Sequence, residues 1–342
     1  MIYENIEFFN VAEIREGVLY RFPLRVCENL GVPEYDKQGN FLRIFKGHLS
    51  SVRASYGTEL RFVTEARTVT LHISVKQKVR VSAYNGDFLL RSVEVRPGEG
   101  DLTFTRPEET DGVRKEGLSR FSVEVWRICI DGEEDIRFNA LETENGAPVR
   151  PPKEGECPRL RLLAYGTSIS QGVGTPYPTL NYLSVAAQIL KIDILNKAAA
   201  GGCFCEKETI EYLCGENFDA VYLEAGTNLA DRPLSVIRER IGGLIDAFCS
   251  RFPDKTIFLM TPIRGLSDVS STASDYRENF PKSRSVICEG AARYPNTVLL
   301  EGHGLLDKDY YLAADILHPS DFGHVMMGVN FAKMLAPYLS VK

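Results

Sequence analysis

The sequence predicts an all-β sandwich over residues 1–150, followed by an α/β domain over residues 151–342 whose parallel sheet is covered on both faces. Three observations predict this. Apolar residues alternate with a period of two in the first part, Pro and Gly interrupt residues 142–158, and strands alternate with amphipathic helices thereafter. A chain of 342 residues also exceeds one typical domain, so we expect two hydrophobic cores.

The alternation is clearest over residues 69–75, and it resumes over residues 79–83. In the first segment aliphatic and polar residues alternate in the order Val69, Thr70, Leu71, His72, Ile73, Ser74 and Val75. This pattern is typical of strands with one buried and one solvated face. His72 lies on the polar face, where we expect it to be exposed or bonded to a neighbour rather than to act as a ligand.

Two turn signals organise these strands into hairpins. Asn85 and Gly86 predict a tight turn, and Asp131 and Gly132 predict a second one after the apolar run of residues 126–130. Several short strands with turn signals and no clear helix predict a β-sandwich of jelly-roll type. Four aromatic residues offer a sugar-stacking platform as an alternative to a purely structural role: Tyr56, Tyr84, Phe88 and Trp126.

The second part alternates strands and helices. The expected strands are residues 159–165, 192–196, 220–225, 256–261 and 297–300, and the expected helices are residues 180–190, 205–213, 234–252, a stretch within 276–293, and 321–339 with Ser320 as its N-cap. Five strands alternating with helices predict a three-layer domain. In the flavodoxin-like strand order 2-1-3-4-5, the site lies where the order reverses, at the carboxyl ends of strands 1 and 3.

The expected strand ends place polar residues at that position. Strand 1 runs directly into Ser168, strand 3 runs into Asn228, and strand 2 is followed by a turn of small residues that contains Gly201. The backbone N–H groups of such a turn can approach a ligand. Two roles are open for the serines of the first turn: Ser168 or Ser170 caps the next helix, or one of them faces the crevice as a nucleophile.

Near the carboxyl end, Asp315 precedes His318 by three residues. A serine hydrolase needs a histidine to take the proton of the serine and a carboxylate to orient that histidine, and this spacing lets one loop supply both. Pro319 disfavours helical geometry at His318, which places the pair on an extended turn. Of the two rivals, His303 has no neighbouring carboxylate in the sequence except Glu301 and Asp307, and His324 falls inside the final helix, where a structural role is expected.

In combination these residues resemble the SGNH, or GDSL-type, serine hydrolase family over about residues 158–338. The four motifs of the family are matched in order by Gly166, Thr167 and Ser168 with Gly172; by Gly201; by Gly226, Thr227 and Asn228; and by Asp315 with His318. Two positions depart from the common pattern. Thr167 and Leu229 stand where many members carry Asp. These departures affect the expected structure of the turns and not the expected catalytic residues.

The resemblance implies a role for each residue. Ser168 would be the nucleophile, His318 the general base and then acid, and Asp315 the residue that orients the histidine. The backbone N–H groups of Ser168 and Gly201 would form the oxyanion hole with the side-chain amide of Asn228. Ser170 is the weaker alternative nucleophile.

The N-terminal β-sandwich makes the whole chain similar to family-2-type carbohydrate esterases. This similarity implies a serine esterase that removes short acyl groups, acetyl foremost, from a carbohydrate, while the sandwich shapes the substrate cleft or an oligomer contact. Two alternatives stay open: a lipid or thioester acylhydrolase, and a catalytically silent glycan-binding protein. We expect a small-molecule or oligosaccharide ester as the substrate.

Composition limits the other partners and the compartment. A formal charge of −6 without long single-sign runs makes nucleic acid and anionic membrane unexpected partners. A secretory signal is not visible, and no window reaches the roughly 18 apolar residues of a spanning helix. The eight cysteines are then expected to be reduced thiols in a cytoplasmic protein. Cys203, Cys205 and Cys214 lack a fourth ligand at zinc-like spacing, so neither a metal nor a cofactor is expected.

Overall fold

The structure is a computed structural model that describes the chain apart from residues 36–39, 46–48, 114–119, 133–134, 270, 272–273 and 340–342. The chain forms two compact units, each assembled from separate segments. The β unit comprises Met1–Leu24, Arg53–Arg159 and Lys191–Leu195, and the α/β unit comprises Arg25–Val52, Leu160–Leu190 and Asn196–Lys342. This division differs from the predicted one, because Arg25–Val52 groups with the later half of the chain.

The β unit contains two antiparallel sheets. In order across the first sheet are β1 (Ile2–Tyr3), β2 (Ile6–Phe9), β7 (Thr58–Thr64), β12 (Val125–Asp131), β9 (Val79–Asn85) and β10 (Phe88–Val95), with β14 (Val149–Arg150) also paired to β7. The second sheet consists of β11 (Gly98–Thr105), β8 (Thr68–Val75), β13 (Ile136–Thr143), β4 (Val18–Tyr20) and β3 (Glu13–Arg15). The predicted sandwich class is therefore confirmed.

The predicted alternation appears directly in β8. Every second residue of that strand is buried, and the residues between are half-exposed, His72 among them. The Nδ1 atom of His72 lies 2.7 Å from the Asp101 carboxylate of the adjacent strand, so the histidine is bonded to a neighbour as expected. The turn at Asn85 and Gly86 is also confirmed, because β9 and β10 form a hairpin in which Asn85 pairs with Phe88.

The hairpin turn predicted at Asp131 and Gly132 is wrong. Strand β12 pairs on one side with β7 and on the other with β9, so neither of its edges can accept the following strand. The chain therefore crosses after Asp131, and β13 joins the second sheet beside β8. A dipeptide reports a local change of direction, but it carries no information on whether the neighbouring edge is already occupied.

The core of the β unit excludes one member of the aromatic platform considered from the sequence. Trp126 is fully buried and stacks on Phe62 with ring centroids 6.2 Å apart and the planes 2° from parallel. An indole in that position cannot reach a sugar, and it packs among the aliphatic side chains of the two sheets. Trp126 is therefore a core residue.

A five-stranded parallel sheet organises the later part of the chain, although residues 193–195 of its edge strand group with the β unit. Across the sheet the strands are β16 (Asp193–Asn196), β15 (Arg161–Gly166), β17 (Ala220–Glu224), β18 (Ile257–Met260) and β19 (Thr297–Leu300). In sequence numbering this is the predicted order 2-1-3-4-5. The four residues of β18 and the five of β17 are all buried, as expected for strands covered on both faces.

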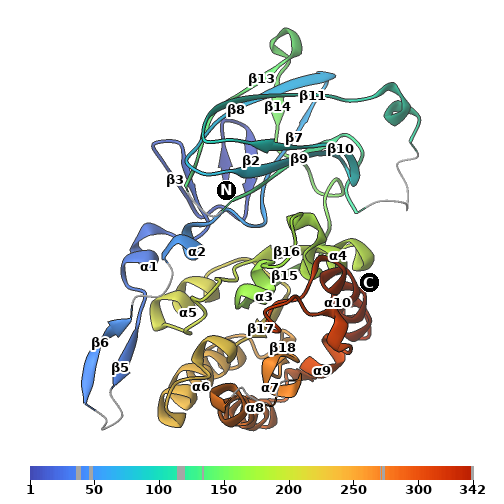
Figure 1. Cartoon of the computed structure of the whole chain (residues 1–342). Coiled ribbons are helices and arrows are strands. Elements are labelled where there is room, and N and C mark those ends of the chain that lie inside the picture. The colour runs from blue at the N-terminus through green and yellow to red at the C-terminus, as the bar shows by residue number, and fades with distance from the viewer. Residues whose placement is uncertain are drawn as a thin grey trace. The chain divides into compact units, whose positions relative to one another are not determined.

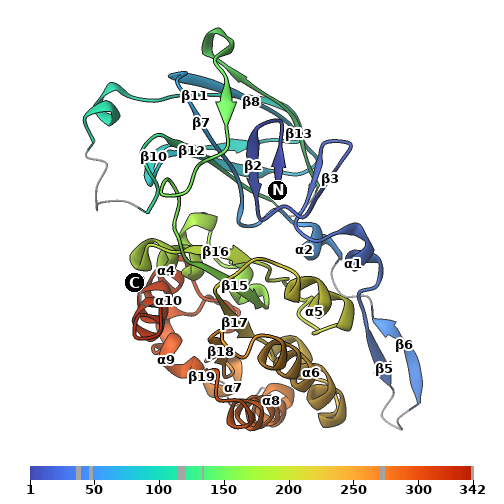
Figure 2. The same ribbon diagram turned by 180° about the vertical axis from the view of Figure 1, so that it is seen from behind.

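Helices cover both faces of this sheet, as Figures 1 and 2 show. They are α3 (Ser168–Gln171), α4 (Tyr182–Leu190), α5 (Lys207–Cys214), α6 (Leu234–Arg251), α7 (Leu266–Val269), α8 (Ser274–Arg293), α9 (Gly302–Leu305) and α10 (Asp321–Leu335). Helix α4 packs against α10, whereas α6 packs against α5 and α8. Within the described residues, none of the helices has the length and apolarity needed to cross a membrane.

The segment Arg25–Val52 adds a two-stranded hairpin to the α/β unit. Its strands are β5 (Val32–Tyr35) and β6 (Phe41–Phe45), flanked by the short helices α1 (Leu24–Glu28) and α2 (Leu49–Arg53). The backbone N–H of Gly31 donates to the Glu206 carboxylate just before α5 at 3.2 Å. Residues far apart in the sequence therefore build one unit.

Candidate active site

The turn that carries Ser168 joins β15 to α3. Thr167 is the N-cap of α3, and its side chain accepts a hydrogen bond from the backbone N–H of Ile169. Gly172, with φ of +113°, ends the helix in the left-handed conformation. The N-cap is therefore Thr167 and neither Ser168 nor Ser170, the two candidates considered from the sequence, and this leaves the Ser168 hydroxyl available for other bonds.

Ser168, His318 and Asp315 form a continuous hydrogen-bonded chain. The Nε2 atom of His318 lies 2.8 Å from the Ser168 Oγ, and the Nδ1 atom lies 2.7 Å from an Asp315 carboxylate oxygen. The second oxygen of Asp315 accepts the backbone N–H groups of Leu317 and His318, each at 3.0 Å. Partial burial raises the pKa of Asp315, but these bonds outweigh it and hold the pKa below its usual value.

The loop that presents His318 is closed at its base by short-range bonds. Leu312 and Pro319 form an antiparallel bridge, and the backbone N–H of Ala313 donates to the His318 carbonyl at 2.7 Å. Ser320 then caps α10 as predicted, accepting from the Gly323 N–H at 3.1 Å. The extended segment at His318 therefore lies between the Leu312–Pro319 bridge and the cap of α10. These contacts fix the direction of the His318 imidazole.

Asn228 and Gly201 follow neighbouring strands of the same sheet. Asn228 lies in a short 3-10 turn over Thr227–Leu229 after β17, and its Oδ1 atom accepts the backbone N–H of Cys203 at 3.1 Å. Because an N–H group can pair only with the oxygen end of the amide, the Nδ2 donor is directed away from Cys203. Gly201 and Asn228 line one cavity of about 340 Å³.

A buried carboxylate bonds to the turn that carries Ser168. One oxygen of Glu224, at the end of β17, accepts the backbone N–H of Thr167 at 2.8 Å and its hydroxyl at 2.7 Å. The Ser170 hydroxyl donates to the same oxygen at 3.0 Å. Burial raises the pKa of Glu224 to about 7, although these three bonds oppose the shift.

The close approach of the Glu224 and Ser170 side chains to the backbone requires glycine at position 166. A Cβ atom added there would lie 2.7 Å from the Glu224 carboxylate and 2.5 Å from the Ser170 hydroxyl. Thr167 stands where the family that the sequence resembles commonly has Asp. The Glu224 carboxylate, at the end of the neighbouring strand β17, reaches the same turn.

Gln171 links the two turns of the site. Its Oε1 atom accepts the backbone N–H of Ala200 at 2.6 Å, next to Gly201. The carbonyl of Ser170 is in turn held by the side-chain amides of Asn181 and Asn196, both at 2.9 Å. This scaffold is not evident from the sequence. The only available signal was the cluster of amide side chains around the ends of the first two strands.

The weaker candidates lie elsewhere. Ser170 bonds to Glu224 and to the Tyr182 hydroxyl at 2.6 Å rather than to His318. His324 is fully buried, donates from Nε2 to the Val173 carbonyl at 2.9 Å and stacks on Tyr182. Burial lowers the pKa of His324 to about 4, so it is neutral and structural.

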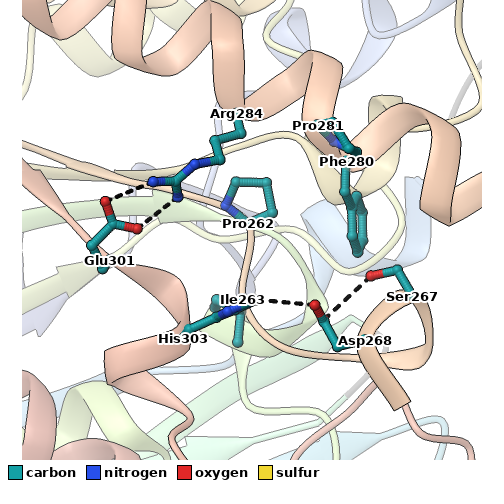
Figure 3. A pocket seen from close by; sticks show the side chains of 9 residues that line it. All are labelled: Pro262, Ile263, Ser267, Asp268, Phe280, Pro281, Arg284, Glu301 and His303. Atoms are coloured by element: carbon teal, nitrogen blue, oxygen red, sulfur yellow. Dashed lines mark hydrogen bonds and ion pairs between the residues drawn. The ribbon is translucent and has the colours of Figure 1, made fainter. Parts of the chain in front are cut away.

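His303 lies in a second cavity, of about 440 Å³, beyond β18 and β19. Figure 3 shows it facing Asp268, whose carboxylate is 3.1 Å from the His303 Nε2, while Arg284 faces Glu301. From the sequence, Glu301 and Asp307 are the carboxylates expected near His303. The partner is instead Asp268, which lies in the short helix α7 after β18.

The cysteines considered as a metal site are free thiols. This holds for Cys203, Cys205 and Cys214, and burial raises the pKa of the Cys203 and Cys214 thiols. Among the residues that the structure describes, no group of three His, Cys, Asp or Glu side chains is arranged to hold a metal ion.

No protein-family model matches the sequence, and no curated protein matches it. Solved structures do. The salicylyl-acyltransferase SsfX3 from a tetracycline biosynthetic pathway aligns with a TM-score of 0.79 at 15% identity, over 99% of this chain and 96% of that one. A Bacteroides ovatus protein assigned as a GDSL-like lipase aligns with a TM-score of 0.68 at 15% identity, over 97% and 98%.

A family-two carbohydrate esterase from Cellvibrio japonicus also aligns over nearly the whole length. The TM-score is 0.57 at 12% identity, and the alignment covers 98% of this chain and 95% of that one. At such identities the likeness defines the fold. The chain therefore has the fold of GDSL-type, or SGNH, hydrolases preceded by a β-sandwich, and the resemblance noted in the sequence is confirmed at that level.

Proposed function

We propose that this protein is a serine esterase that works through an acyl-enzyme, with Ser168 as nucleophile, His318 as base and acid, and Asp315 as the orienting carboxylate. The observation that carries the proposal is the hydrogen-bonded chain from Ser168 through His318 to Asp315, with both imidazole nitrogens at 2.7–2.8 Å from their partners. This is the contact order that nucleophilic catalysis by serine requires.

The reaction proceeds in two balanced halves. The Ser168 Oγ attacks the ester carbonyl carbon while its proton passes to the His318 Nε2, and the carbonyl oxygen takes the negative charge. The bond to the alcohol oxygen then breaks, and His318 returns the proton to that oxygen. Water repeats the sequence on the acyl-enzyme and releases the acid. The N–H groups of Ser168 and Gly201 and the Asn228 amide are the donors for the transient oxyanion.

The substrate class is the finer part of the proposal. We infer short-chain acyl esters, acetyl foremost, of a carbohydrate or an oligosaccharide. The support is that several proteins of the same fold are named family-two carbohydrate esterases and one is named an acetyl xylan esterase. We further propose the cytoplasm as the compartment. Lipid or thioester hydrolysis, and glycan binding without catalysis, are the outcomes against which this proposal is tested.

The test is hydrolysis of p-nitrophenyl acetate by the purified chain, compared with Ser168→Ala and His318→Ala. Both variants should lose activity by about 10³-fold or more, because each removes one member of a unit that acts together. His303→Ala is the matched control for the rival histidine and should retain activity. A folded Ser168→Ala protein with full activity would remove the assignment.

Two further measurements separate the alternatives. A fluorophosphonate should label Ser168 stoichiometrically, a result that a silent glycan-binding protein would not give. A chain-length series that peaks at long acyl groups would favour a lipid substrate instead. Because an acyl-enzyme can also pass its acyl group to an alcohol, and one protein of this fold is named an acyltransferase, products should be analysed with a sugar present.

A further inference from the structure

The turn that carries Ser168 has little stability of its own. It leads into α3, a single helical turn of four residues, Ser168–Gln171. Forming the first turn of a helix fixes several backbone angles for few hydrogen bonds, so very short helices depend on contacts with the rest of the protein. The positions of the Ser168 hydroxyl and N–H are therefore determined by the side chains that hold this turn.

Glu224 holds the turn on both sides of Ser168. Gly166 and Glu224 are the last residues of β15 and β17, and they lie opposite one another in the parallel register. One carboxylate oxygen, Oε2, accepts the backbone N–H and the hydroxyl of Thr167, and it also accepts the hydroxyl of Ser170. A single oxygen therefore restrains the chain both before and after the serine.

The Thr167 hydroxyl extends this contact to the cap of α3. It donates its one proton to Glu224 and accepts the backbone N–H of Ile169 at 3.4 Å. Hydrogen bonds to an ionised acceptor are shorter and roughly twice as strong as bonds between neutral groups, and successive bonds in a chain polarise one another. A negative charge on Glu224 therefore strengthens the helix cap as well as the three direct bonds.

The titratable groups around Glu224 are two phenols and a thiol. Burial raises the pKa of Tyr182 on α4, of Tyr222 on β17 and of Cys203 after β16, and the Glu224 charge adds to each rise. These three groups are therefore uncharged near neutral pH. Burial raises the pKa of Glu224 itself to about 7, so Glu224 is the member of this cluster whose charge changes in that range.

This charge has a cost. An ionised carboxylate in a buried position has lost its hydration, and its hydrogen bonds offset only part of that loss. Carboxyl groups with strongly perturbed pKa values cluster at functional sites, and this one touches the residues on both sides of the proposed nucleophile.

We propose that Glu224 is a positioning residue of the proposed esterase: its negative charge tightens the turn of residues 167–170, and this holds the Ser168 hydroxyl against His318 and directs the Ser168 N–H toward the oxyanion. The inference rests on the proposed function and deepens it. Glu224 acts through Thr167 and Ser170 rather than on the reacting atoms, and the reactivity of Ser168 depends on whether Glu224 is ionised.

The test is the second-order rate constant for fluorophosphonate labelling of Ser168 in wild type and in Glu224→Gln. It is measured at about pH 5.5 and about pH 8.5, on either side of the Glu224 pKa of about 7. The ratio of the wild-type rate to the variant rate should be about 1 at the lower pH, where both acceptors are neutral, and about tenfold at the higher pH. Protonation of His318 cancels in this ratio, because both proteins contain it. A ratio that does not change with pH overturns the proposal.

Glu206→Gln is the matched control. Glu206 is also buried, burial raises its pKa to about 7 as well, and its carboxylate accepts the Gly31 N–H at 3.2 Å instead of a group in the turn. Its labelling rate should stay within about twofold of wild type at both pH values, because sites without shared partners act independently. Equal ratios in the Glu206 and Glu224 variants overturn the proposal.

Urea unfolding separates positioning from a loss of folded protein. As the pH rises, the free energy of unfolding of Glu224→Gln should increase relative to wild type, while its relative labelling rate falls. A structural role alone would move both quantities in the same direction, and that result would overturn the proposal.

A double-mutant cycle tests the route through Ser170. Ser170→Ala removes one of the three donors to Glu224 and should lower the labelling rate at the higher pH by about threefold. In the Glu224→Gln background the same substitution should have almost no further effect, because the charge that strengthened this bond is already gone. Losses that add fully mean that the two residues act separately, and they overturn the proposal.

The outcome of this test can be distinguished from that of the proposed function. If wild type is neither labelled nor active on esters, the proposed function fails. Crystal structures of wild type and Glu224→Gln at the higher pH then still decide the positioning role. The distance from the Ser168 Oγ to the His318 Nε2, 2.8 Å here, should be longer in the variant, and an unchanged distance overturns the role. If esters are hydrolysed but the labelling ratio does not depend on pH, only the positioning proposal fails.

Discussion

The side-chain amide of Asn228 has two ends with different tasks. Its oxygen fixes the turn by accepting the Cys203 N–H, which leaves the nitrogen end to donate to an oxyanion. In the proposed esterase, one side chain would combine a structural and a catalytic role, and a substitution that removes both at once cannot separate them.

We expect Asn228→Ala to lower kcat for p-nitrophenyl acetate by about 10²- to 10³-fold, because one oxyanion donor is lost. Asn228→Asp is the informative companion, since it keeps an acceptor for Cys203 and removes the donor. Steady-state kinetics should show Asp as impaired as Ala, although its thermal unfolding stays closer to wild type. Recovery of kcat in the Asp variant would assign Asn228 a positioning role only.

At this scale, the sequence was sufficient to predict which side chains the structure brings together in one hydrogen-bonded chain. Ser168, Asp315 and His318 could be named because strand order and a three-residue spacing constrain them. Glu224 and Gln171 were not identifiable, since a buried acid or amide is recognised only when its partners, distant in sequence, are known.

At the scale of elements, the cap of α10 stabilises the loop that presents His318. The Ser320 hydroxyl accepts from Gly323 and donates to the Tyr311 carbonyl at 3.0 Å, so it holds both the helix start and the base of the loop. Local helix-capping chemistry and the position of the imidazole are therefore coupled.

Ser320→Ala should lower the free energy of unfolding by about 1 kcal/mol, the usual cost of a lost N-cap. It should also reduce kcat modestly, because His318 lies only two residues before the cap. Urea denaturation and kinetics on p-nitrophenyl acetate check both effects. Ser320→Asp restores an acceptor and should recover most of the stability; equal loss in both variants would assign the effect to the Tyr311 bond.

Helices and strands of the α/β unit were predictable almost throughout, because their hydrophobic periods are long and regular. The predicted strand at residues 297–300 coincides with β19. The predicted helix at residues 234–252 begins where α6 begins and ends one residue after the end of α6. The hairpin formed by β5 and β6 was not predicted. Its exposed strand Phe41–Phe45 shows no alternation of burial, so the period-two signal is missing.

At the scale of the whole molecule, three buried carboxyl groups share an unusual state. Burial raises the pKa of Glu206 and Glu224 to about 7 and that of Asp131 to about 8. At a pH between its ordinary pKa and its raised pKa, each group binds more protons in the folded chain than in the unfolded chain. The contribution of these three groups to stability therefore decreases as the pH rises from about 4 to about 8.

Glu224→Gln should remove one part of this dependence. The pKa rise from 4.5 to about 7 corresponds to on the order of 3 kcal/mol. Relative to wild type, the free energy of unfolding of the variant should increase by roughly that amount as the pH rises from 4.5 to 8. Urea unfolding across that range measures it. Glu239→Gln, at a side chain that is 73% exposed, is the control and should show no such trend.

The succession of a β-rich and an α/β half was visible in the sequence, but the composition of the units was not. Hydrophobic periods describe what a segment becomes, whereas membership of a unit depends on contacts between segments distant along the chain. Nothing in Arg25–Val52 or in Lys191–Leu195 signals that each groups with residues from the other half.

This interleaving has a consequence for synthesis on the ribosome. The β unit needs Lys191–Leu195, and the segment Arg25–Val52 can complete its unit only when α10 has emerged, some 280 residues later. At 5–20 residues per second the early segment waits on the order of 15–60 s. Throughout that interval its apolar surface lacks its final neighbours, so the nascent chain is expected to depend on holding chaperones, and its two units cannot be exchanged between proteins by a single recombination event.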